Sequence, residues 1–562
     1  MGKMMKNKNW LLALLVVIFL GTMAFFMTMA MKGDSATTDE TIHVLSGYEY
    51  WRGRFTVNPE HPPLGKQIAT IGLDLLKPIM PINQRYEKAI KDYYYDSWAE
   101  TREYSQKWLF KTVGNNAEQI VNSARTIVII FTIILAIIMF FVARKWYGWL
   151  AALISVFLFA FSPVILTHGH LANTDLWMTL GFFISIFSFA YYLEKPHWWR
   201  LVLAAVCFAL AILFKFSAVL LIPILVILWF VYRAKSQDRK NYSLKSFSIL
   251  LLTFILISGF LIWADYGFPR HFAPPFVADP AFTYTNKPLR VLAPILTHLP
   301  VPEYFKGLVM VFATSVSERP AYLLGHFSAG GWWYYFPLAF LVKEPLPFIL
   351  VLLSGLGCWI GWRKKLEFKD WLLVIPPAFY LLITLFTKLN IGIRHLMPIY
   401  PFLFIFAGYF ISELFTRYKK SLITYYLLLI TLAIMAVWYL SASICIYPYF
   451  MTYFNELAGG PRNGAAILVD SNIDWGQDMK RLANWLKEND ITDQIKMEYY
   501  WASADQVDYY GVNYVGLKES DPTQRGWIVI GVSSLQRPVF SWLKNYTPVK
   551  IIGNSVYVYY LQ

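Results

Sequence analysis

Long apolar stretches dominate the hydrophobic pattern of this chain. A membrane-spanning helix needs about 20 mostly apolar residues to cross roughly 30 Å of hydrocarbon. About eleven stretches approach or reach that length, near residues 10–31, 120–142, 147–166, 176–193, 201–213, 219–232, 247–264, 346–362, 371–386, 396–412 and 422–445. The pattern predicts an all-α polytopic membrane protein with about eleven transmembrane helices.

Short basic segments between these stretches predict the orientation, because cytoplasmic loops carry an excess of Lys and Arg. Three lysines precede the first stretch, whose apolar run is longer than the 7–15 residues of a signal-peptide core, so we expect an uncleaved anchor. The N-terminus is predicted to be cytoplasmic. The expected inner segments are residues 1–9, 144–145, 194–200, 233–245, 363–370 and 413–420.

With the N-terminus inside, an odd number of spans places the C-terminus outside the membrane. We expect two domains in the chain. Residues 1–445 form the membrane domain, with outer loops at about 32–119 and 265–343, of which the first is large. Residues 446–562 form a small extracytoplasmic α/β domain. Its apolar runs predict strands at 465–469, 495–500, 527–532 and 555–561, and helical spacing predicts a helix at 474–486.

Composition agrees with a membrane protein. The 562 residues are 57% hydrophobic and 15% charged, with a mean hydropathy of +0.44, whereas soluble globular chains run to roughly 25% charged residues. The three cysteines exclude a disulfide scaffold. The formal charge is +15, and the inner segments hold 19 basic but only 5 acidic residues. The excess charge therefore reflects membrane orientation and indicates no nucleic-acid partner.

Ionisable residues collect at the predicted outer ends of the spans, where such groups are functional candidates. Cations there would hold the phosphate of an anionic lipid-linked donor and stabilise the charge it gains on leaving. A carboxylate would remove the proton from an incoming hydroxyl. The residues concerned are Asp39, Glu40, Asp175, Lys215, Lys343, Arg394 and His395.

Distinctive motifs accompany these residues. The chain reads D-E-T-I-H from Asp39, H-P-P-L-G-K at 61–66, G-W-W-Y-Y-F-P at 331–337, K-E-P-L-P at 343–347, I-R-H-L-M-P-I-Y-P-F at 393–402, Y-F-N-E-L-A-G-G-P at 453–461 and D-S-N-I-D-W-G-Q-D at 470–478. Together they resemble the protein O-mannosyltransferase family (glycosyltransferase family 39, C-type glycosyltransferase superfamily). The resemblance is closest to its prokaryotic phospholipid-carrier-dependent members.

The resemblance implies a role for each matching residue. Asp39 and Glu40 match the family's catalytic acidic pair, with Asp39 as the base. Lys66 and Arg394 would contact the donor phosphate. The resemblance assigns Lys215 and Lys343 to the same phosphate site, although these two residues match the family less closely. The resemblance also implies that Asp175, His61 and His395 orient the substrates.

Several of these residues also have a structural interpretation that needs no role in catalysis or binding. Glu40 could support its neighbour, and His61 could anchor the Pro-containing backbone. The aromatic residues 332–335 could stack on sugar or form an interfacial belt, and residues 470–478 could bind the acceptor or cap a helix. His168, His170 and Asp175 leave a divalent metal possible but not indicated, and no other cofactor is implied.

The resemblance thus implies an inverting glycosyltransferase that moves a sugar from a polyprenyl-phosphate-linked donor to a hydroxyl acceptor at the outer face of the plasma membrane. The acceptor would be a protein Ser or Thr, or a glycolipid or glycan of the cell envelope. A large late insert is missing from residues 265–343, unlike eukaryotic members of the family. The alternatives are a lipid-linked sugar transporter or flippase and a non-catalytic glycan-binding membrane protein.

Overall fold

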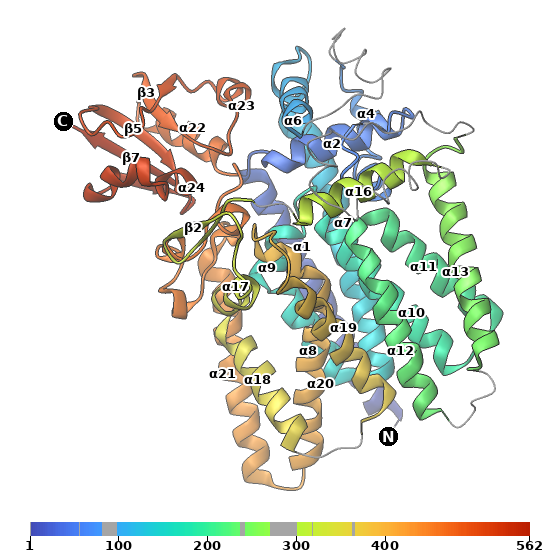
Figure 1. Cartoon of the computed structure of the whole chain (residues 1–562). Coiled ribbons are helices and arrows are strands. Elements are labelled where there is room, and N and C mark those ends of the chain that lie inside the picture. Colours follow the sequence, from blue (N-terminus) through green and yellow to red (C-terminus); the bar gives the residue numbers. More distant parts are fainter. Residues whose placement is uncertain are drawn as a thin grey trace.

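The protein is a bundle of apolar helices with a small sheet domain at one end (Figure 1). The computed structural model describes residues 2–55, 57–80, 98–236, 242–269, 301–316, 319–361 and 366–562. Parts of both predicted outer loops (81–97 and 270–300) and of two predicted inner segments (237–241 and 362–365) lie outside the described residues.

Seven helices within these ranges are long and apolar enough to cross a membrane. They include α1 (Gly2–Gly33), α7 (Ala117–Tyr147), α10 (Asp175–Glu194), α13 (Leu244–Asp265) and α21 (Leu422–Ile446), and two that begin with a 3-10 turn: η2 with α12 (Phe216–Leu220, Leu221–Lys235) and η3 with α20 (Ile393–Ile399, Tyr400–Tyr418). The bent pair α17 (Tyr335–Lys343) and α18 (Leu346–Gly361) would be an eighth span, with 119° between its helices. The chain is therefore a multi-pass membrane protein.

The predicted number of about eleven spans is not confirmed, although each predicted stretch coincides with a helix. The remaining stretches fall on α8 (Trp149–Ala160), α11 (Trp198–Phe214) and α19 (Phe368–Thr384), which have 12, 17 and 17 residues. The stretch at 147–166 is interrupted, because α9 (Pro163–His168) begins a new helix there. Its N-cap Ser162 accepts a hydrogen bond from the Ile165 amide, and Pro163 follows at the first helical position.

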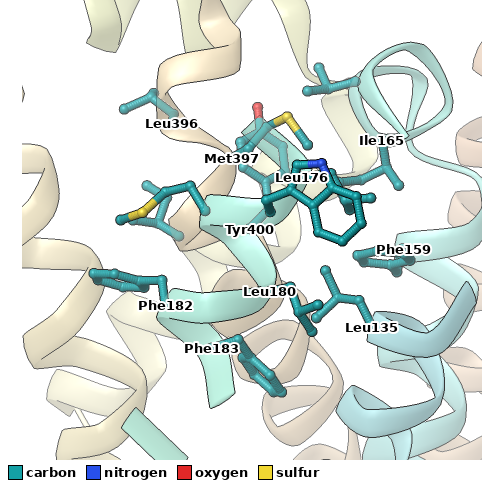
Figure 2. Close-up of a cluster of buried hydrophobic side chains, with 14 of the residues drawn as sticks. Leu135, Phe159, Ile165, Leu176, Leu180, Phe182, Phe183, Leu396, Met397 and Tyr400 are labelled. Atoms are coloured by element: carbon teal, nitrogen blue, oxygen red, sulfur yellow. The ribbon is translucent and has the colours of Figure 1, made fainter. Parts of the chain in front are cut away.

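Helix α10 lies at the centre of the bundle. Leu176, Leu180, Phe182 and Phe183 on this helix pack with Leu135 of α7 and Phe159 of α8 (Figure 2). The same cluster includes Leu396, Met397 and Tyr400 from the start of the η3 and α20 segment. In lipid, helix association depends on close van der Waals packing. This packing places the N-terminus of α10 next to η3, and both carry predicted site residues.

Short elements cover the bundle at the end near the sheet domain. The described part of the first loop contains α2 (Thr38–Tyr50), α3 (Leu64–Ala69), α4 (Leu73–Leu76), α6 (Trp98–Gln106) and η1 (Lys107–Lys111), a turn of π-helix. The second loop contributes α16 (Pro302–Val316) and the antiparallel hairpin of β1 (Ala321–Leu323) and β2 (His326–Ser328). The chain then returns to the bundle through α17.

The predicted α/β module is present at the C-terminus. Its mixed sheet has the order β4-β3-β5-β7-β6, with β3 parallel to β4 and β5 and the other pairs antiparallel. The strands are β3 (Ile495–Glu498), β4 (Tyr514–Gly516), β5 (Gly526–Gly531), β6 (Lys550–Ile552) and β7 (Val556–Leu561), and the helices are α22 (Met479–Glu488), α23 (Ala504–Tyr509), α24 (Val532–Leu535) and the 3-10 helix η8 (Pro538–Asn545). One apolar cluster includes side chains of α22 and the other includes side chains of η8, with strand residues in both.

Two predictions for this region are wrong. Residues 465–469 form no strand: they overlap the 3-10 turn η6 (Gly464–Ala466), and Leu468 packs into the core of the bundle. The helix predicted from residue 474 begins only at Met479. Residues before it form the 3-10 turn η7 (Asp470–Asn472), and Gly476 has a φ of +91°, which an α-helix cannot contain.

The segment between α21 and α22 ties the sheet domain to the bundle. It includes the 3-10 turns η4 (Phe450–Thr452) and η5 (Glu456–Ala458). The Asn455 side-chain amide donates to the carbonyls of Leu341 and Glu344 at 2.6 and 2.7 Å, and the Lys343 ammonium donates to Met451 and Asn472. Lys343, one of the predicted phosphate ligands, therefore lies at this junction.

Gly47 allows α2 to approach α3 closely. A Cβ at this position would lie 2.3 Å from the Lys66 carbonyl oxygen and 2.7 Å from Thr70 Oγ1. We expect Gly47→Ala to lower the free energy of unfolding by about 1–3 kcal/mol, the usual cost of overpacking. Thermal unfolding of the purified protein in detergent measures the effect as a lower Tm.

The matched control is Gly21→Ala in α1, where nothing lies within 4 Å of the added Cβ. Replacing a helical glycine by alanine there is expected to leave the Tm unchanged or to raise it, since alanine favours helix by roughly 0.5–1 kcal/mol. A loss of Tm in Gly21→Ala equal to that in Gly47→Ala would contradict the packing explanation.

Candidate active site

A chain of ion pairs joins four of the predicted site residues. Asp39 Oδ2 lies 3.7 Å from an Arg394 guanidinium nitrogen, and a second nitrogen of Arg394 lies 3.3 Å from Asp175 Oδ2. The other oxygen of Asp175 accepts a hydrogen bond from Lys215 Nζ at 2.6 Å. Residues that are up to 355 positions apart in the sequence thus form one cluster of alternating charge.

Helix boundaries position these side chains. Asp39 is the second residue of α2, and Asp175 is the first residue of α10, where the positive end of the helix dipole favours a carboxylate. Lys215 directly follows α11, and its extended backbone separates that helix from η2. Arg394 lies in η3, the 3-10 turn that precedes α20. Each charge is therefore fixed at the end of a helix near the sheet domain.

The C-terminal segment supports Arg394. Arg394 Nε donates to Ser471 Oγ at 3.2 Å, and the guanidinium carbon of Arg394 lies 4.1 Å above the ring of the buried Trp475. A planar guanidinium can stack on an aromatic ring while its edge makes bidentate contacts. The motif at 470–478 therefore orients the central cation of the site, a role that sequence reasoning missed although it singled out the motif.

Asp39 is the most accessible carboxylate of the cluster. Its side chain is 21% exposed, against 2% for Asp175. Burial raises the pKa of Asp39 above its usual value, and the Asp175 charge adds to this effect, while Arg394 and Arg102 oppose it. A carboxylate with a raised pKa is a stronger base, which suits it to accept a proton from a hydroxyl group.

Glu40 faces away from this cluster and is fully engaged. It accepts bonds of 2.6 and 2.7 Å from Arg125, one of 2.8 Å from the Ala172 amide and two of 2.9 Å from Thr37. Burial raises its pKa, but the Arg125 charge and these bonds outweigh burial and lower it. Of the two roles considered for Glu40, this geometry favours support of the helix that carries Asp39.

Lys66 holds the loop that follows α2. Its ammonium donates to Asn58 Oδ1 at 2.8 Å, to the Asn58 carbonyl at 3.0 Å, to Tyr50 at 3.1 Å and to the His61 carbonyl at 3.2 Å. Burial among these uncharged oxygens lowers the pKa of Lys66 well below its usual value. The structure therefore places Lys66 beside His61, with its ammonium hydrogens engaged by protein oxygens.

The two predicted histidines are half-buried. The buried nitrogens His61 Nδ1 and His395 Nε2 have no hydrogen-bond partner among the described residues. The His61 ring lies 5.5 Å from that of His43, and the His395 ring lies 6.3 Å from Phe336. His43 was missed, although its position four residues after Asp39 puts it on the same face of α2. Burial, with Lys66 and Lys215 nearby, lowers the pKa of His43 well below its usual value.

No group of three or more His, Cys, Asp or Glu side chains in the described part of the chain could hold a metal ion. The considered set of His168, His170 and Asp175 is divided between other partners. His170 contacts Asp34 Oδ2 at 2.9 Å and the Leu166 carbonyl at 2.7 Å, while Asp175 binds the two cations described above.

Residues 104–263 match the model of the dolichyl-phosphate-mannose-protein mannosyltransferase family. The resemblance to this family is confirmed. The matched residues include Asp175 and Lys215 of the ion-pair chain and Arg125, the partner of Glu40. Among curated proteins, none matches the chain.

Solved structures of similar shape include ArnT from Cupriavidus metallidurans. Its undecaprenyl-phosphate-bound form is 13% identical with a TM-score of 0.48 and 97% of each chain covered, and the apo form is 13% identical with a TM-score of 0.49 and 98% of each covered. The Archaeoglobus fulgidus oligosaccharyltransferase is 12% identical with a TM-score of 0.45, covering 91% of this chain and 68% of that one. At these scores the likeness carries no argument about activity.

Asp474, in the segment that supports Arg394, titrates unusually. Its Oδ1 accepts bonds from Tyr499 at 3.0 Å and from the Gly476 amide at 3.2 Å, while its buried Oδ2 has no partner among the described residues. Burial raises the pKa of Asp474 to about 8. The folded state therefore holds the proton more tightly than the unfolded chain, whose Asp pKa is about 3.9.

This pKa predicts how stability depends on pH. Asp474 contributes stability that is full below about pH 4, the unfolded pKa, and is lost as the pH rises through about 8. The loss is at most about 1.4 kcal/mol per pH unit. Asp474→Asn resembles the neutral carboxyl, so its Tm should fall less than that of the parent protein between pH 5 and pH 9. Thermal unfolding across this range measures the difference.

Asp490→Asn serves as the control, since Asp490 is exposed in the same domain. Its Tm should follow the parent protein at every pH. Parallel pH profiles for Asp474→Asn and the parent protein would show that Asp474 is not protonated in the folded state.

Proposed function

We propose that this protein is an inverting glycosyltransferase that uses a polyprenyl-phosphate-linked sugar. The observation that carries the proposal is the chain of charges from Asp39 through Arg394 and Asp175 to Lys215, in which the base candidate is the accessible member. The match to dolichyl-phosphate-mannose-protein mannosyltransferases supports a lipid-phosphate donor. Cationic side chains can stabilise the leaving phosphate in this reaction.

The reaction is a single displacement at the anomeric carbon. Asp39 removes the proton from the acceptor hydroxyl, and the hydroxyl oxygen forms the new bond to that carbon. The bond from the anomeric carbon to the phosphate oxygen breaks, and its electron pair leaves with the polyprenyl phosphate. Attack opposite the leaving group inverts the configuration, and the phosphate gains one negative charge that nearby cations stabilise.

Arg394 and Lys215 are the cations best placed for this charge. The 3.7 Å contact between Arg394 and Asp39 is the longest of the ion-pair chain. A donor phosphate that takes over this side of the guanidinium would release Asp39 to act as the base. Asp175 would meanwhile hold both cations in position. The ammonium groups of Lys66 and Lys343 are bound by protein oxygens, so we assign them mainly to the loop and to the C-terminal junction.

The proposed location is the outer side of the plasma membrane. The N-terminus of α1 and the sheet domain lie at opposite ends of the bundle (Figure 1). With the basic N-terminal residues in the cytoplasm, the ion-pair chain and the sheet domain would lie outside. The acceptor hydroxyl would belong to a protein or to an envelope glycolipid or glycan that reaches this surface.

The decisive experiment removes the charge of the base. We expect Asp39→Asn to lower turnover by roughly 10²–10⁴-fold, the usual contribution of a general base, while donor affinity is retained. The assay incubates purified protein with a panel of polyprenyl-phosphate sugars and measures released polyprenyl phosphate. Glu103→Gln, an exposed residue of the same loop, is the matched control and should retain turnover.

Two results would reject the proposal. The first is no release of polyprenyl phosphate by the parent protein from any donor, which a transporter or glycan-binding protein would also give. The second is full turnover by Asp39→Asn, which would remove Asp39 from the chemistry.

Arg394 and Lys215 are tested through donor affinity. We expect Arg394→Lys and Lys215→Gln each to weaken donor binding by roughly 10- to 100-fold, because each loses charge-assisted hydrogen bonds to phosphate. Lysine keeps the charge of Arg394 but lacks its planar fork. Binding of a labelled donor measures the effect, with Lys107→Gln as a control at an exposed cation. Unchanged affinity in both variants would exclude these residues from the phosphate site.

A further inference from the structure

A cavity of about 410 Å³ lies beside the ion-pair chain. Its lining includes Tyr322 and Phe327 of the β1–β2 hairpin, Tyr500 and Trp501 after β3, and Arg537 before η8. The hairpin is tied to the C-terminal segment, because the Leu324 amide donates to the Ile467 carbonyl at 3.0 Å. The volume falls within the roughly 300–1,000 Å³ of small-molecule sites.

Two connections link this cavity to the proposed reaction. The Trp501 carbonyl accepts a hydrogen bond of 2.8 Å from Thr38 Oγ1, and Thr38 directly precedes Asp39. Asp470, also on the lining, directly precedes Ser471, which accepts the bond from Arg394. The cavity wall therefore adjoins both the proposed base and the proposed phosphate-binding cation.

Five aromatic residues line the cavity. Besides the four rings of the hairpin and the 500–501 segment, Tyr335 at the start of α17 contributes a fifth. Phe327 and Tyr500 are 45% and 56% exposed. Ser533, Ser534 and Asn390 supply hydroxyl and amide groups on the same wall. Flat apolar faces beside a few polar groups fit a sugar ring, whose C–H face stacks on aromatic carbon while its hydroxyls form hydrogen bonds.

The charges on the wall disfavour an anionic ligand. Asp470 and Arg537 are the only charged residues among the described residues that line the cavity. Arg537 is already paired, at 2.6 Å with Glu519 and at 3.6 Å with Glu498. A phosphorylated or carboxylated ligand would therefore find no unpaired cation on this wall and would face the Asp470 carboxyl.

We propose that this cavity binds the acceptor and that the acceptor is an uncharged saccharide, either a free glycan or the headgroup of a glycolipid. The proposal rests on the proposed function, because it places the acceptor hydroxyl next to Asp39. The rings come from three separate segments around a cavity of small-molecule size, beside hydroxyl and amide groups, which suits a sugar ring better than an extended chain. A saccharide is therefore favoured over a Ser- or Thr-containing peptide.

The test measures saccharide binding to the purified full-length protein in detergent by saturation-transfer NMR. The probes are three uncharged trisaccharides (mannotriose, maltotriose and chitotriose), mannose 6-phosphate, and a neutral Ser/Thr peptide. Tyr500→Ala and Phe327→Ala each remove one exposed ring from the wall. Tyr560→Ala is the matched control, since Tyr560 is 50% exposed and does not line the cavity.

We expect at least one uncharged trisaccharide to bind and each wall variant to weaken its binding about tenfold or more, the effect of losing an aromatic partner. Tyr560→Ala should bind as the parent protein does. No binding of any uncharged trisaccharide, equal binding by both wall variants, or Tyr500-dependent binding of only the phosphorylated sugar or the peptide would overturn the proposal.

Binding in this assay needs no donor and no proton transfer, so it is measured independently of turnover. If the cavity proposal fails, saccharide binding is lost while polyprenyl phosphate is still released from donors. If the glycosyltransferase proposal fails, no release occurs whatever binds in the cavity.

Discussion

The position of the Arg394 guanidinium is the constraint on which the candidate site depends. It lies between Asp39 and Asp175, stacks on Trp475 and donates to Ser471. Removing one partner from a buried ion pair typically costs 3–5 kcal/mol, because an uncompensated charge remains. The Arg394 side chain therefore contacts the first loop, the centre of the bundle and the C-terminal segment at once.

A second buried ion pair supports this arrangement at the N-terminus of α2. Glu40 closes the N-terminus of that helix and pairs with Arg125 of α7. Asp39 and Glu40 are neighbours in the sequence, yet one is partly exposed and the other is saturated with hydrogen bonds. Their environments differ in burial and in partners, so adjacent carboxylates have pKa values shifted in opposite directions.

Under the proposed function, the C-terminal domain would take part in substrate binding as well as in the structure of the site. Its segment 470–478 orients Arg394, and residues 500–501 and 533–539 form part of the cavity wall. A saccharide in that cavity would approach Asp39 from the sheet domain, while a lipid-linked donor would approach from the bundle. The two proposed substrates would then meet at the ion-pair chain.

The sequence by itself determined the apolar helices, the sheet module and the chemistry of the charged residues, since long apolar stretches and alternating strands are local patterns. It also identified Asp39, Asp175, Lys215 and Arg394 as candidates through their places beside spans and in motifs. Only the tertiary structure decided which candidates meet, because their contacts join distant segments. In the tertiary structure, Lys66 and Lys343 donate to protein oxygens, and Trp475 stacks on Arg394. Several helices are shorter than the predicted spans because turns and buried packing interrupt the apolar stretches.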